Sequence, residues 1–379
     1  MPESERASEI DMHGTLWPAQ PGNQPDLRKV GLHPNFWYPL ALASKVKKGG
    51  TLAVSFAGEP IVLVRTESNR VFALEDRCAH RQMPLSCGVV EGERLKCCYH
   101  AWVYNEHGRC AIPYLPKGVP MPRGVRAYPS REEYGFIFVF PGDPALADKV
   151  PFPDLPAVRS DAHKTMLFAR QTNCHYSFMH ENLMDMNHQF LHRRFLKRVK
   201  PTLLDVRKEA GKVEVDYKFE LAEGKAPLGS KFMLGRRDAA VQDGKFDIMT
   251  VGTHYPYQIL QLRHPERDEP AVSLWSAYVP VDPAQRANMT MGLLTIKKPA
   301  LAPLLTLFWP IIRRFTEAVF AEDRFAVEAE QRAYDEQGAD WNQEILPFIH
   351  DLRGLLVAGG TPIDPTLRPA PVGLAETSA

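Results

Sequence analysis

The chain has 379 residues, a length that allows two or three domains. Hydrophobic residues make up 44% and charged residues 24%, which excludes a wholly disordered chain and leaves material for a sizeable core. With 46 basic and 45 acidic residues the formal net charge is +1, which argues against a general nucleic-acid-binding or anionic-membrane surface. Six cysteines are too few for a disulfide scaffold.

The sequence shows no targeting or spanning segment. Met1–Val30 is polar and lacks the apolar run of a signal peptide. The most apolar run, Pro299–Ile312, is shorter than the roughly 18–20 residues that a spanning helix needs, and Pro303 and Pro310 interrupt it. We therefore expect a cytoplasmic protein that neither spans a membrane nor binds nucleic acid.

The first half of the chain predicts a small all-β domain. We expect residues 1–29 to form an N-terminal arm and residues 30–150 to form this domain. Short β-rich runs separated by turn residues predict its strands at Thr51–Phe56, Ile61–Thr66, Arg70–Leu74 and Tyr134–Phe140. The proline-rich stretch Pro151–Pro156 then predicts a linker.

The second half, residues 151–379, mixes strands with helices. Cys174–Arg198 and Thr306–Tyr334 predict helices on either side of the strands. The strands are expected at Thr165–Arg170, Val213–Phe219, Asp247–Tyr255, Gln258–Arg263, Val272–Val281 and Asn288–Ile296. Their spacing is typical of an antiparallel meander, so we predict an α+β second domain.

Two pairs of metal-ligand residues stand in the β-rich half. Cys78 and His80 form C-x-H, and Cys97 and His100 form C-x-x-H. Two Cys and two His can hold zinc, or a Rieske [2Fe–2S] cluster with two thiolates on one iron and two imidazoles on the other. Each pair supplies one sulfur and one nitrogen, which favours two loop tips that clamp a two-iron cluster. Zinc and a chance grouping remain alternatives, and Cys98 could replace Cys97, which we prefer.

The text CAHRQMPLS…CCYHAWVY, with Trp102 after the second pair, resembles the Rieske domain of Rieske non-haem iron oxygenases. Rieske proteins of respiratory complexes are less similar, because they carry two further cysteines that form a disulfide, one of them at the position of Tyr99. Cys87 and Cys98 stand at the wrong offsets for that pair. Cys87 and Cys110 are interpreted as small buried hydrophobic residues.

A second group of histidines stands in the predicted helix. His188 and His192 are four residues apart, which on a helix places both imidazoles on one face. Two histidines and one carboxylate form the facial triad of non-haem Fe(II) oxygenases. Such a pair alone is more often a surface or core feature. Next to a Rieske motif, an iron site becomes the favoured interpretation of the pair, because a one-electron carrier in the same chain implies a site that accepts its electrons.

The text N-L-x-D-x-x-H, which contains Asn182, Asp185 and His188, resembles the helix motif of vanillate demethylase-like and dicamba monooxygenase-like oxygenases. The resemblance implies that Asp185 bridges two metal centres, bonding His188 of its own chain and the partner subunit's His100. The chain departs from many relatives in having three residues, not four, between His188 and His192. His175 and His180 do have four between them, but no Asp stands three residues upstream, so we interpret that pair as a decoy.

The third ligand must come from elsewhere in the chain. The segment Phe320–Glu328 resembles the family's E-D-x-x-x-x-E stretch, whose Asp is the third ligand, and this implies Asp323. A solvated acidic helix face is the alternative interpretation. Glu317, Glu322 and Glu328 are the fallback ligands.

The resemblance covers Val30–Tyr334 and implies a Rieske-type oxygenase. Such an enzyme uses O₂ and electrons from NAD(P)H, relayed by a separate flavin reductase and often a ferredoxin, to hydroxylate or demethylate an aromatic or lipophilic cyclic substrate. No G-x-G-x-x-G fingerprint is seen, which fits a reductase on another chain. The vanillate-like resemblance favours monooxygenation and a homotrimer. A non-catalytic Rieske electron carrier with a binding domain is the alternative from another class.

Two further segments carry open interpretations. The Phe, Leu and Trp content of Leu301–Phe320 favours an apolar substrate or a hydrophobic entrance, or else a buried helix that packs on the sheet. The basic run Arg193–Arg198 is a solvated helix end, a subunit contact or a docking patch for an acidic electron donor.

Overall fold

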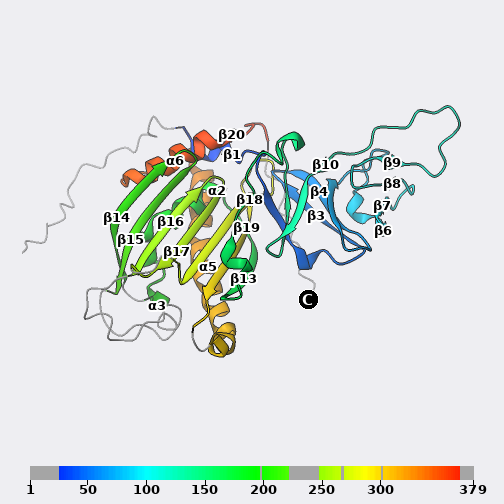
Figure 1. The fold of residues 1–379 in the computed structure, drawn as a ribbon. Coiled ribbons are helices and arrows are strands. Elements are labelled where there is room, and N and C mark those ends of the chain that lie inside the picture. The colour runs from blue at the N-terminus through cyan, green and yellow to red at the C-terminus, as the bar shows by residue number, and fades with distance from the viewer. Residues whose placement is uncertain (1–24, 197–198, 222–246, 266–268, 300–301, 368–379) are drawn as a thin grey trace, which may run out of the picture.

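A seven-stranded antiparallel sheet is the largest sheet in this computed structural model, which describes residues 25–196, 199–221, 247–265, 269–299 and 302–367 (Figure 1). Its strand order is β13-β19-β18-β17-β16-β15-β14. Consecutive strands from β14 to β19 pair with each other, so this part is the predicted meander. The strands are β13 (His163–Thr172), β14 (Val199–Glu209), β15 (Lys212–Leu221), β16 (Asp247–His254), β17 (Tyr257–Arg263), β18 (Val272–Pro280) and β19 (Asn288–Lys297).

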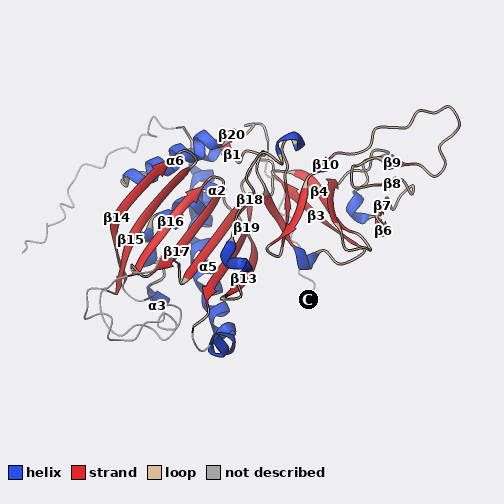
Figure 2. Cartoon of the chain, in the orientation of Figure 1, coloured by secondary structure: helices blue, strands red, loops and turns tan. Residues whose placement is uncertain are grey.

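Three helices, α2 (Tyr176–Met184), α5 (Ala302–Gln337) and α6 (Pro347–Gly359), lie behind this sheet in Figures 1 and 2. The long helix α5 keeps a narrow apolar stripe toward the core, because Leu305 and Ile312 are seven residues apart and Val327 and Tyr334 repeat that spacing; all four are buried. The described residues also form the short helices α1 (Pro156–Arg159) and α3 (Arg193–Leu196). No described helix is long and apolar enough to span a membrane.

The first half of the chain contains three small antiparallel sheets (Figure 2). Their orders are β10-β5-β4-β3, β11-β12-β2 and β6-β7-β8-β9, and the last of them carries the Cys97 loop. The strands are β2 (Tyr38–Leu42), β3 (Gly50–Phe56), β4 (Glu59–Arg65), β5 (Val71–Glu75), β6 (Val89–Glu91), β7 (Arg94–Lys96), β8 (Val103–Tyr104), β9 (Cys110–Ala111), β10 (Ala127–Tyr128), β11 (Ser130–Glu133) and β12 (Phe136–Val139). Strands β1 (Val30–Gly31) and β20 (Thr361–Pro362) pair separately and join the two ends of the described chain.

The two halves share one hydrophobic core. The rings of Phe138 and Trp275 lie 6.1 Å apart, and the Tyr257 hydroxyl donates to the Trp37 carbonyl at 2.6 Å. The backbone N–H of Ala57 also donates to the Pro280 carbonyl at 2.7 Å. The α+β class is therefore confirmed, while the boundaries at residues 30 and 150 stay predictions.

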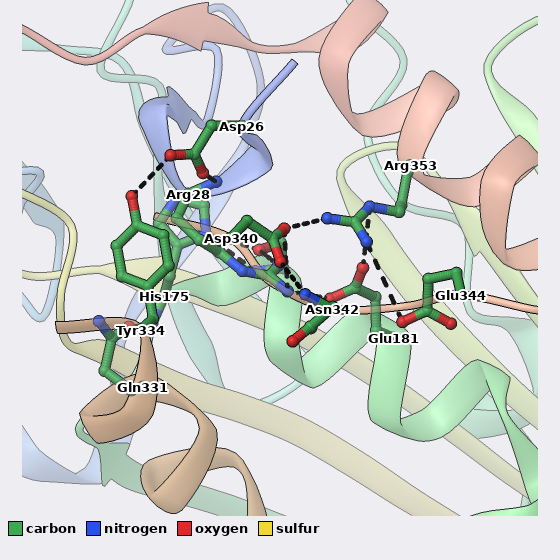
Figure 3. Close-up of polar contacts among 11 residues, drawn as sticks. Asp26, Arg28, His175, Glu181, Gln331, Tyr334, Asp340, Asn342, Glu344 and Arg353 are labelled. Atoms are coloured by element: carbon green, nitrogen blue, oxygen red, sulfur yellow. Dashed lines mark hydrogen bonds and ion pairs between the residues drawn. The ribbon is translucent and has the colours of Figure 1, made fainter. Parts of the chain in front are cut away.

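A buried ionic network ties both ends of the described chain to α2 (Figure 3). Arg28 pairs with Glu181 of α2, and Arg353 of α6 pairs with Asp340. Arg353 Nε also lies 3.4 Å from Glu181 Oε1, and Arg28 Nη2 lies 3.9 Å from Asp340 Oδ2. Burial acts to lower the pKa of Arg28, but the two carboxylates outweigh it and raise the pKa. Two cations thus alternate with two anions, which offsets the cost of burying them.

Two predictions about the chain's path are wrong or incomplete. The expected single helix Cys174–Arg198 ends at Met184, because Asp185 adopts extended backbone and a 3-10 helix, η5 (Met186–Phe190), follows. The last residues of the predicted arm are also firmly packed, since Leu27 and Arg28 are buried. Most of that arm, residues 1–24, lies outside the described residues. Strand β14 and helix α6 were not predicted.

Candidate metal centres

The loops that carry Cys78 and Cys97 have the same backbone pattern. The N–H of Cys78 donates to the Met83 carbonyl, and the N–H of Cys97 donates to the Trp102 carbonyl, both at 2.8 Å. Each cysteine carbonyl in turn accepts from the residue four positions on, which has a positive φ in both loops: Gln82 and Ala101. Since Cys97 and Cys78 hold equivalent positions, the pattern singles out Cys97 over its neighbour Cys98.

Burial distinguishes Cys78 and Cys97 from Cys98. Cys78 and Cys97 are 2% and 3% exposed, whereas Cys98 is exposed to solvent. The rings of His80 and His100 lie 4.4 Å apart at the surface, so the loops bring the two imidazoles together. Trp102 stacks on His80 at 4.8 Å with an interplanar angle of 6°. Cys87 is exposed and Cys110 is partly exposed, so the prediction that both are buried is wrong.

Electrostatics around Cys97 oppose the ionisation of its thiol when no metal is bound. Burial raises the pKa of Cys97, and the adjacent Cys78 thiol raises it further, while the N–H groups of Tyr99 and His100 act in the opposite direction. Those N–H groups are donors that can stabilise a thiolate. Because metal ligation deprotonates cysteine outright, two close buried thiols of this kind fit a metal cluster.

Tyr104 is a neighbour of this centre that sequence reasoning missed. Its hydroxyl lies 3.1 Å from Cys78 Sγ and accepts from the Ala79 N–H at 3.1 Å. Since the N–H occupies the oxygen as acceptor, the hydroxyl proton is free to point at the sulfur. Hydrogen bonds to ligand sulfurs set the potential of iron–sulfur clusters. Nothing in the spacing around Tyr104 signalled this contact, which arises from the pairing of β7 with β8.

The second centre brings together His188, His192 and Asp323. One ligand atom from each lies within 4.8 Å of the others. Asp323 Oδ1 is 3.0 Å from His192 Nε2 and 3.7 Å from His188 Nε2, and the two rings are 5.2 Å apart at 90°. This set is two imidazoles and one carboxylate, the donor set of the facial triad.

His192 is held as a metal ligand is usually held. The side chain is 2% exposed, and its Nδ1 lies 2.9 Å from Glu322 Oε2. Its Nε2 is buried and has no hydrogen-bond partner among the described residues, although it faces Asp323. A carboxylate on one ring nitrogen fixes the tautomer and leaves the other nitrogen for a metal. The site therefore fits a divalent iron, and Glu322, named above as a fallback ligand, is instead the partner of His192.

The segment that carries His188 and His192 is not one continuous helix, because the chain turns at Asp185 between α2 and η5. Asp185 caps η5, because its Oδ1 accepts from the N–H of Asn187 at 2.9 Å and from its side-chain amide at 2.8 Å. His188 Nδ1 lies 2.7 Å from the backbone carbonyl of Asp185. The expected bond from the Asp185 carboxylate to His188 is therefore absent from the described chain, since Asp185 is not one helical turn behind His188. The carbonyl orients the ring instead.

The remaining candidates have other partners. Asn182 donates to Asp323 Oδ1 at 3.2 Å and so holds the third ligand. Glu317 pairs with Arg170, and Glu328 accepts from the Asn173 N–H at 2.9 Å.

The decoy histidines are bound elsewhere in the core. His175 Nδ1 lies 2.7 Å from Ser177 Oγ, and His180 Nδ1 lies 3.1 Å from Thr253 Oγ1. Burial lowers the pKa of both rings, so they are neutral core residues. Neither joins a convergent group of potential metal ligands within the described residues.

The two centres lie in different halves of the molecule. In Figure 1 strands β6–β9 stand at the far right, while α2 and α5 lie behind the large sheet at the left. A surface hollow of about 640 Å³ lies next to His100 and is lined by Tyr99, Trp102 and Tyr114, among others. The imidazole end of the first centre is therefore exposed to solvent, on the half of the molecule that does not carry the second centre.

Comparison with known proteins identifies the family of each half of the chain. Residues 36–129 match the Rieske [2Fe-2S] domain, and residues 172–347 match the vanillate O-demethylase oxygenase C-terminal domain. A 4beta-methylsterol monooxygenase of Methylococcus capsulatus (strain ATCC 33009 / NCIMB 11132 / Bath) is 31% identical over 350 residues, which cover 87% of this chain and 89% of that protein. The dicamba O-demethylase oxygenase component of Stenotrophomonas maltophilia is 34% identical over 161 residues, or 42% of this chain and 47% of that protein.

Solved structures show the same fold. Dicamba monooxygenase bound to 3,6-dichlorosalicylic acid superposes with a TM-score of 0.69 at 22% identity, covering 86% of this chain and 98% of that one. Both relatives above are named as oxygenases, so the alternative of a non-catalytic electron carrier finds no support in them. Because the methylsterol monooxygenase is similar along nearly its whole length, the chain belongs to the Rieske non-haem iron oxygenases, monooxygenase components that carry a Rieske [2Fe–2S] cluster and Fe(II).

Proposed function

We propose that this oxygenase hydroxylates or demethylates a lipophilic cyclic substrate with O₂. Its electrons come from NAD(P)H through a separate flavin reductase or a ferredoxin in the cytoplasm. The relative that matches along nearly the whole chain is named for a methylsterol, which supports a lipophilic polycycle over a small aromatic acid. The observation that carries the proposal is the convergence of His188, His192 and Asp323, with the buried Nε2 of His192 facing the Asp323 carboxylate.

The ligands follow from the two centres. In this proposal Cys78 and Cys97 hold one iron of the cluster, His80 and His100 hold the other, and the triad of His188, His192 and Asp323 holds Fe(II). When bound, the cluster supplies electrons singly and Fe(II) supplies the site at which O₂ is reduced.

The residues around the triad do the positioning. Glu322 fixes the ring of His192 through Nδ1, and the Asp185 carbonyl fixes His188 in the same way. Asn182 donates to Asp323 Oδ1, so each of the three ligands has a hydrogen-bonded partner outside the triad. Fixed ligands keep the remaining metal positions open for O₂.

The arrangement of the two centres supports a homotrimer. Since the cluster loops and the triad lie in different halves of one chain (Figure 1), we infer that electrons pass between chains. The hollow next to His100 would receive the surface of the next subunit, where Asp185 lies partly exposed at the start of η5. We propose that the Asp185 carboxylate bonds the partner subunit's His100. Its Oδ1 already caps η5, which leaves Oδ2 as the acceptor.

A substrate screen tests the function. The purified holoprotein, a surrogate reductase and NADH are incubated under ¹⁸O₂ with a 4-methylsterol, a methoxybenzoate and a methylxanthine. The proposal predicts ¹⁸O in a hydroxylated sterol product, and formaldehyde release only if a methoxy or N-methyl group is attacked. Labelled product from the methoxybenzoate alone would contradict the lipophilic substrate class. NADH oxidation without labelled product from any of the three would contradict the proposed function.

A further inference from the structure

The first three turns of α5 present an apolar face to solvent. Leu304, Leu307 and Ile311 are 39%, 69% and 60% exposed, and Phe308 is 37% exposed. Their spacing of three, four and seven residues places them on one side of the helix. In Figure 1 this end of α5 extends below the lower edge of the large sheet. We call these four residues the apolar tip.

Buried side chains outside the apolar tip hold this part of the helix on the core. Leu305 and Ile312, about a quarter of a turn round the helix from the tip, are 2% and 5% exposed and pack into the core. Lys164 of β13 donates to Thr306 Oγ1 at 3.1 Å and lies 4.7 Å from the ring of Trp309. This segment is therefore not a buried helix, and the packing of the core does not explain why its solvent-facing side chains are apolar.

Cations surround the apolar tip, and carboxylates are missing from the same segment. Arg313 and Arg314 are exposed on the next turn, and residues 302–316 contain no Asp or Glu. Helix α3 adds the exposed Arg193 and Arg194, since its Phe195 lies 6.0 Å from the ring of Phe315.

This positive charge also affects a neighbouring side chain on the sheet. The pKa of Arg170 is lowered, first by burial and then by repulsion from Arg313 and Arg324. The end of α5 is therefore apolar at its extremity and positively charged behind it.

We propose that this end of α5 docks on an anionic lipid bilayer, with the apolar tip below the headgroups and Arg313 and Arg314 at the lipid phosphates. At a rise of 1.5 Å per residue, the two arginines stand roughly 9–10 Å along the axis from Leu307. That separation matches the depth of about 5–10 Å to which interfacial helices bury their apolar side chains. Apolar insertion and basic residues each add to the affinity for anionic membranes.

A bilayer fits this surface better than an acidic protein. The cations and the apolar residues follow each other along the helix axis. This order suits a bilayer, in which anionic phosphates lie above an apolar interior. The overall charge of +1 does not oppose the proposal, because the charge is concentrated locally. Where the substrate is lipophilic, which rests on the proposed function, docking would place the N-terminal end of α5 at the phase that dissolves the substrate, with Asp323 roughly 15 Å further along the helix axis than Arg313.

Vesicle flotation of the holoprotein, without substrate or reductase, tests the docking. Vesicles of phosphatidylcholine with phosphatidylglycerol are compared with phosphatidylcholine alone at low salt. We expect binding to the anionic vesicles to fall about tenfold or more in Leu307→Ser/Ile311→Ser, and to a similar extent in Arg313→Gln/Arg314→Gln. The matched controls Ile345→Ser, 86% exposed before α6, and Lys47→Gln/Lys48→Gln, exposed on the other half, should bind like the wild type.

Retention of the cluster absorbance shows that each variant is folded. Should a tip variant lose that absorbance, a second measurement takes its place. Brominated lipid in the vesicles should then quench the tryptophan fluorescence of the wild type, and the quenching should be smaller in Trp309→Phe. Equal binding by wild type and both variants, or no binding to anionic vesicles, would overturn the proposal. So would a change in oligomeric state in Leu307→Ser/Ile311→Ser with unchanged vesicle binding, because the tip would then contact a second copy. None of these outcomes depends on turnover, so they are separate from a failure of the proposed function.

Discussion

Glu322 Oε2 lies 2.9 Å from Nδ1 of His192, while the next residue, Asp323, places Oδ1 3.0 Å from the ring's other nitrogen. Two consecutive residues on one helix thus contact opposite edges of a single imidazole. The pKa of His192 reflects this: burial acts to lower it, but Asp323 and then Glu322 outweigh burial and raise it. The ring is therefore fixed before any metal binds, with a carboxylate against each of its nitrogens.

Removing Glu322 should weaken the mononuclear iron site without touching the cluster. We expect Glu322→Ala to lower iron affinity by about 10–100-fold, the usual cost of losing the partner of a ligand histidine. Glu322→Gln should cost less, since an amide oxygen can still accept from Nδ1. Iron retained against a graded chelator, with cluster absorbance as internal reference, measures the effect. Glu336→Ala, exposed on the same helix, is the control; equal iron retention in the control and in Glu322→Ala would refute the role.

The choice between adjacent cysteines gives a second test. Cys97→Ser should abolish the visible and EPR signature of the cluster, because Cys97 repeats the backbone position of Cys78 and is buried beside it. Cys98→Ser should keep the signature, since that side chain points to solvent. The reverse pattern in the two variants would show that the ligand is Cys98.

The local hydrophobic pattern of the sequence was sufficient to predict most strands of the large sheet, but not the course of the backbone at the iron site. The runs around Thr51–Phe56 and Val272–Val281 alternate or are continuously apolar, and both form strands where expected. Strand β14 gave no such signal, because its Leu203, Leu204 and Val206 are exposed on the edge of the sheet. The break at Asp185 depends on a side-chain cap that competes with the helix, and helical periodicity does not reveal such a cap.

The site itself was predictable in part. His188, His192 and Asp323 were proposed from motif resemblance, and the fold brings them together across more than a hundred residues of sequence. Their supporting contacts were not predictable, because Glu322 and Tyr104 act through tertiary geometry. The burial of Arg28 was likewise hidden, since its partner Glu181 is 153 residues away.

Asp185→Asn tests the electron path between subunits. The amide oxygen can still cap η5, so both metals and the assembly should be retained. Oxidation of the reduced cluster by O₂ with substrate should slow by orders of magnitude, because the carboxylate between the centres is lost. Single-turnover stopped flow measures this step, and Asp143→Asn, which alters the equivalent cap of the 3-10 helix Pro144–Leu146, is the control. Unchanged cluster oxidation in a fully metallated variant would remove Asp185 from the path.

Arg28→Ala should destabilise the protein even though Arg28 lies far from the predicted cluster ligands. Removing one partner of a buried ion pair costs about 3–5 kcal/mol, because Glu181 and Asp340 are left without their cation. The neighbouring variant Lys29→Ala, whose side chain is 64% exposed, should cost about 1 kcal/mol or less. Chemical denaturation followed by circular dichroism compares the two. Equal midpoints would mean that the network does not anchor the N-terminal segment.

The most direct test of the account counts iron and acid-labile sulfide in the wild type and in Asp323→Ala. Two irons in the cluster and one at the triad predict about three irons and two sulfides per chain in the wild type. In the variant we expect about two of each, with an unchanged cluster spectrum, since two histidines alone hold Fe(II) poorly without the anionic ligand. Two irons and two sulfides in both proteins would contradict the central claim, because the chain would then hold a cluster but no second iron.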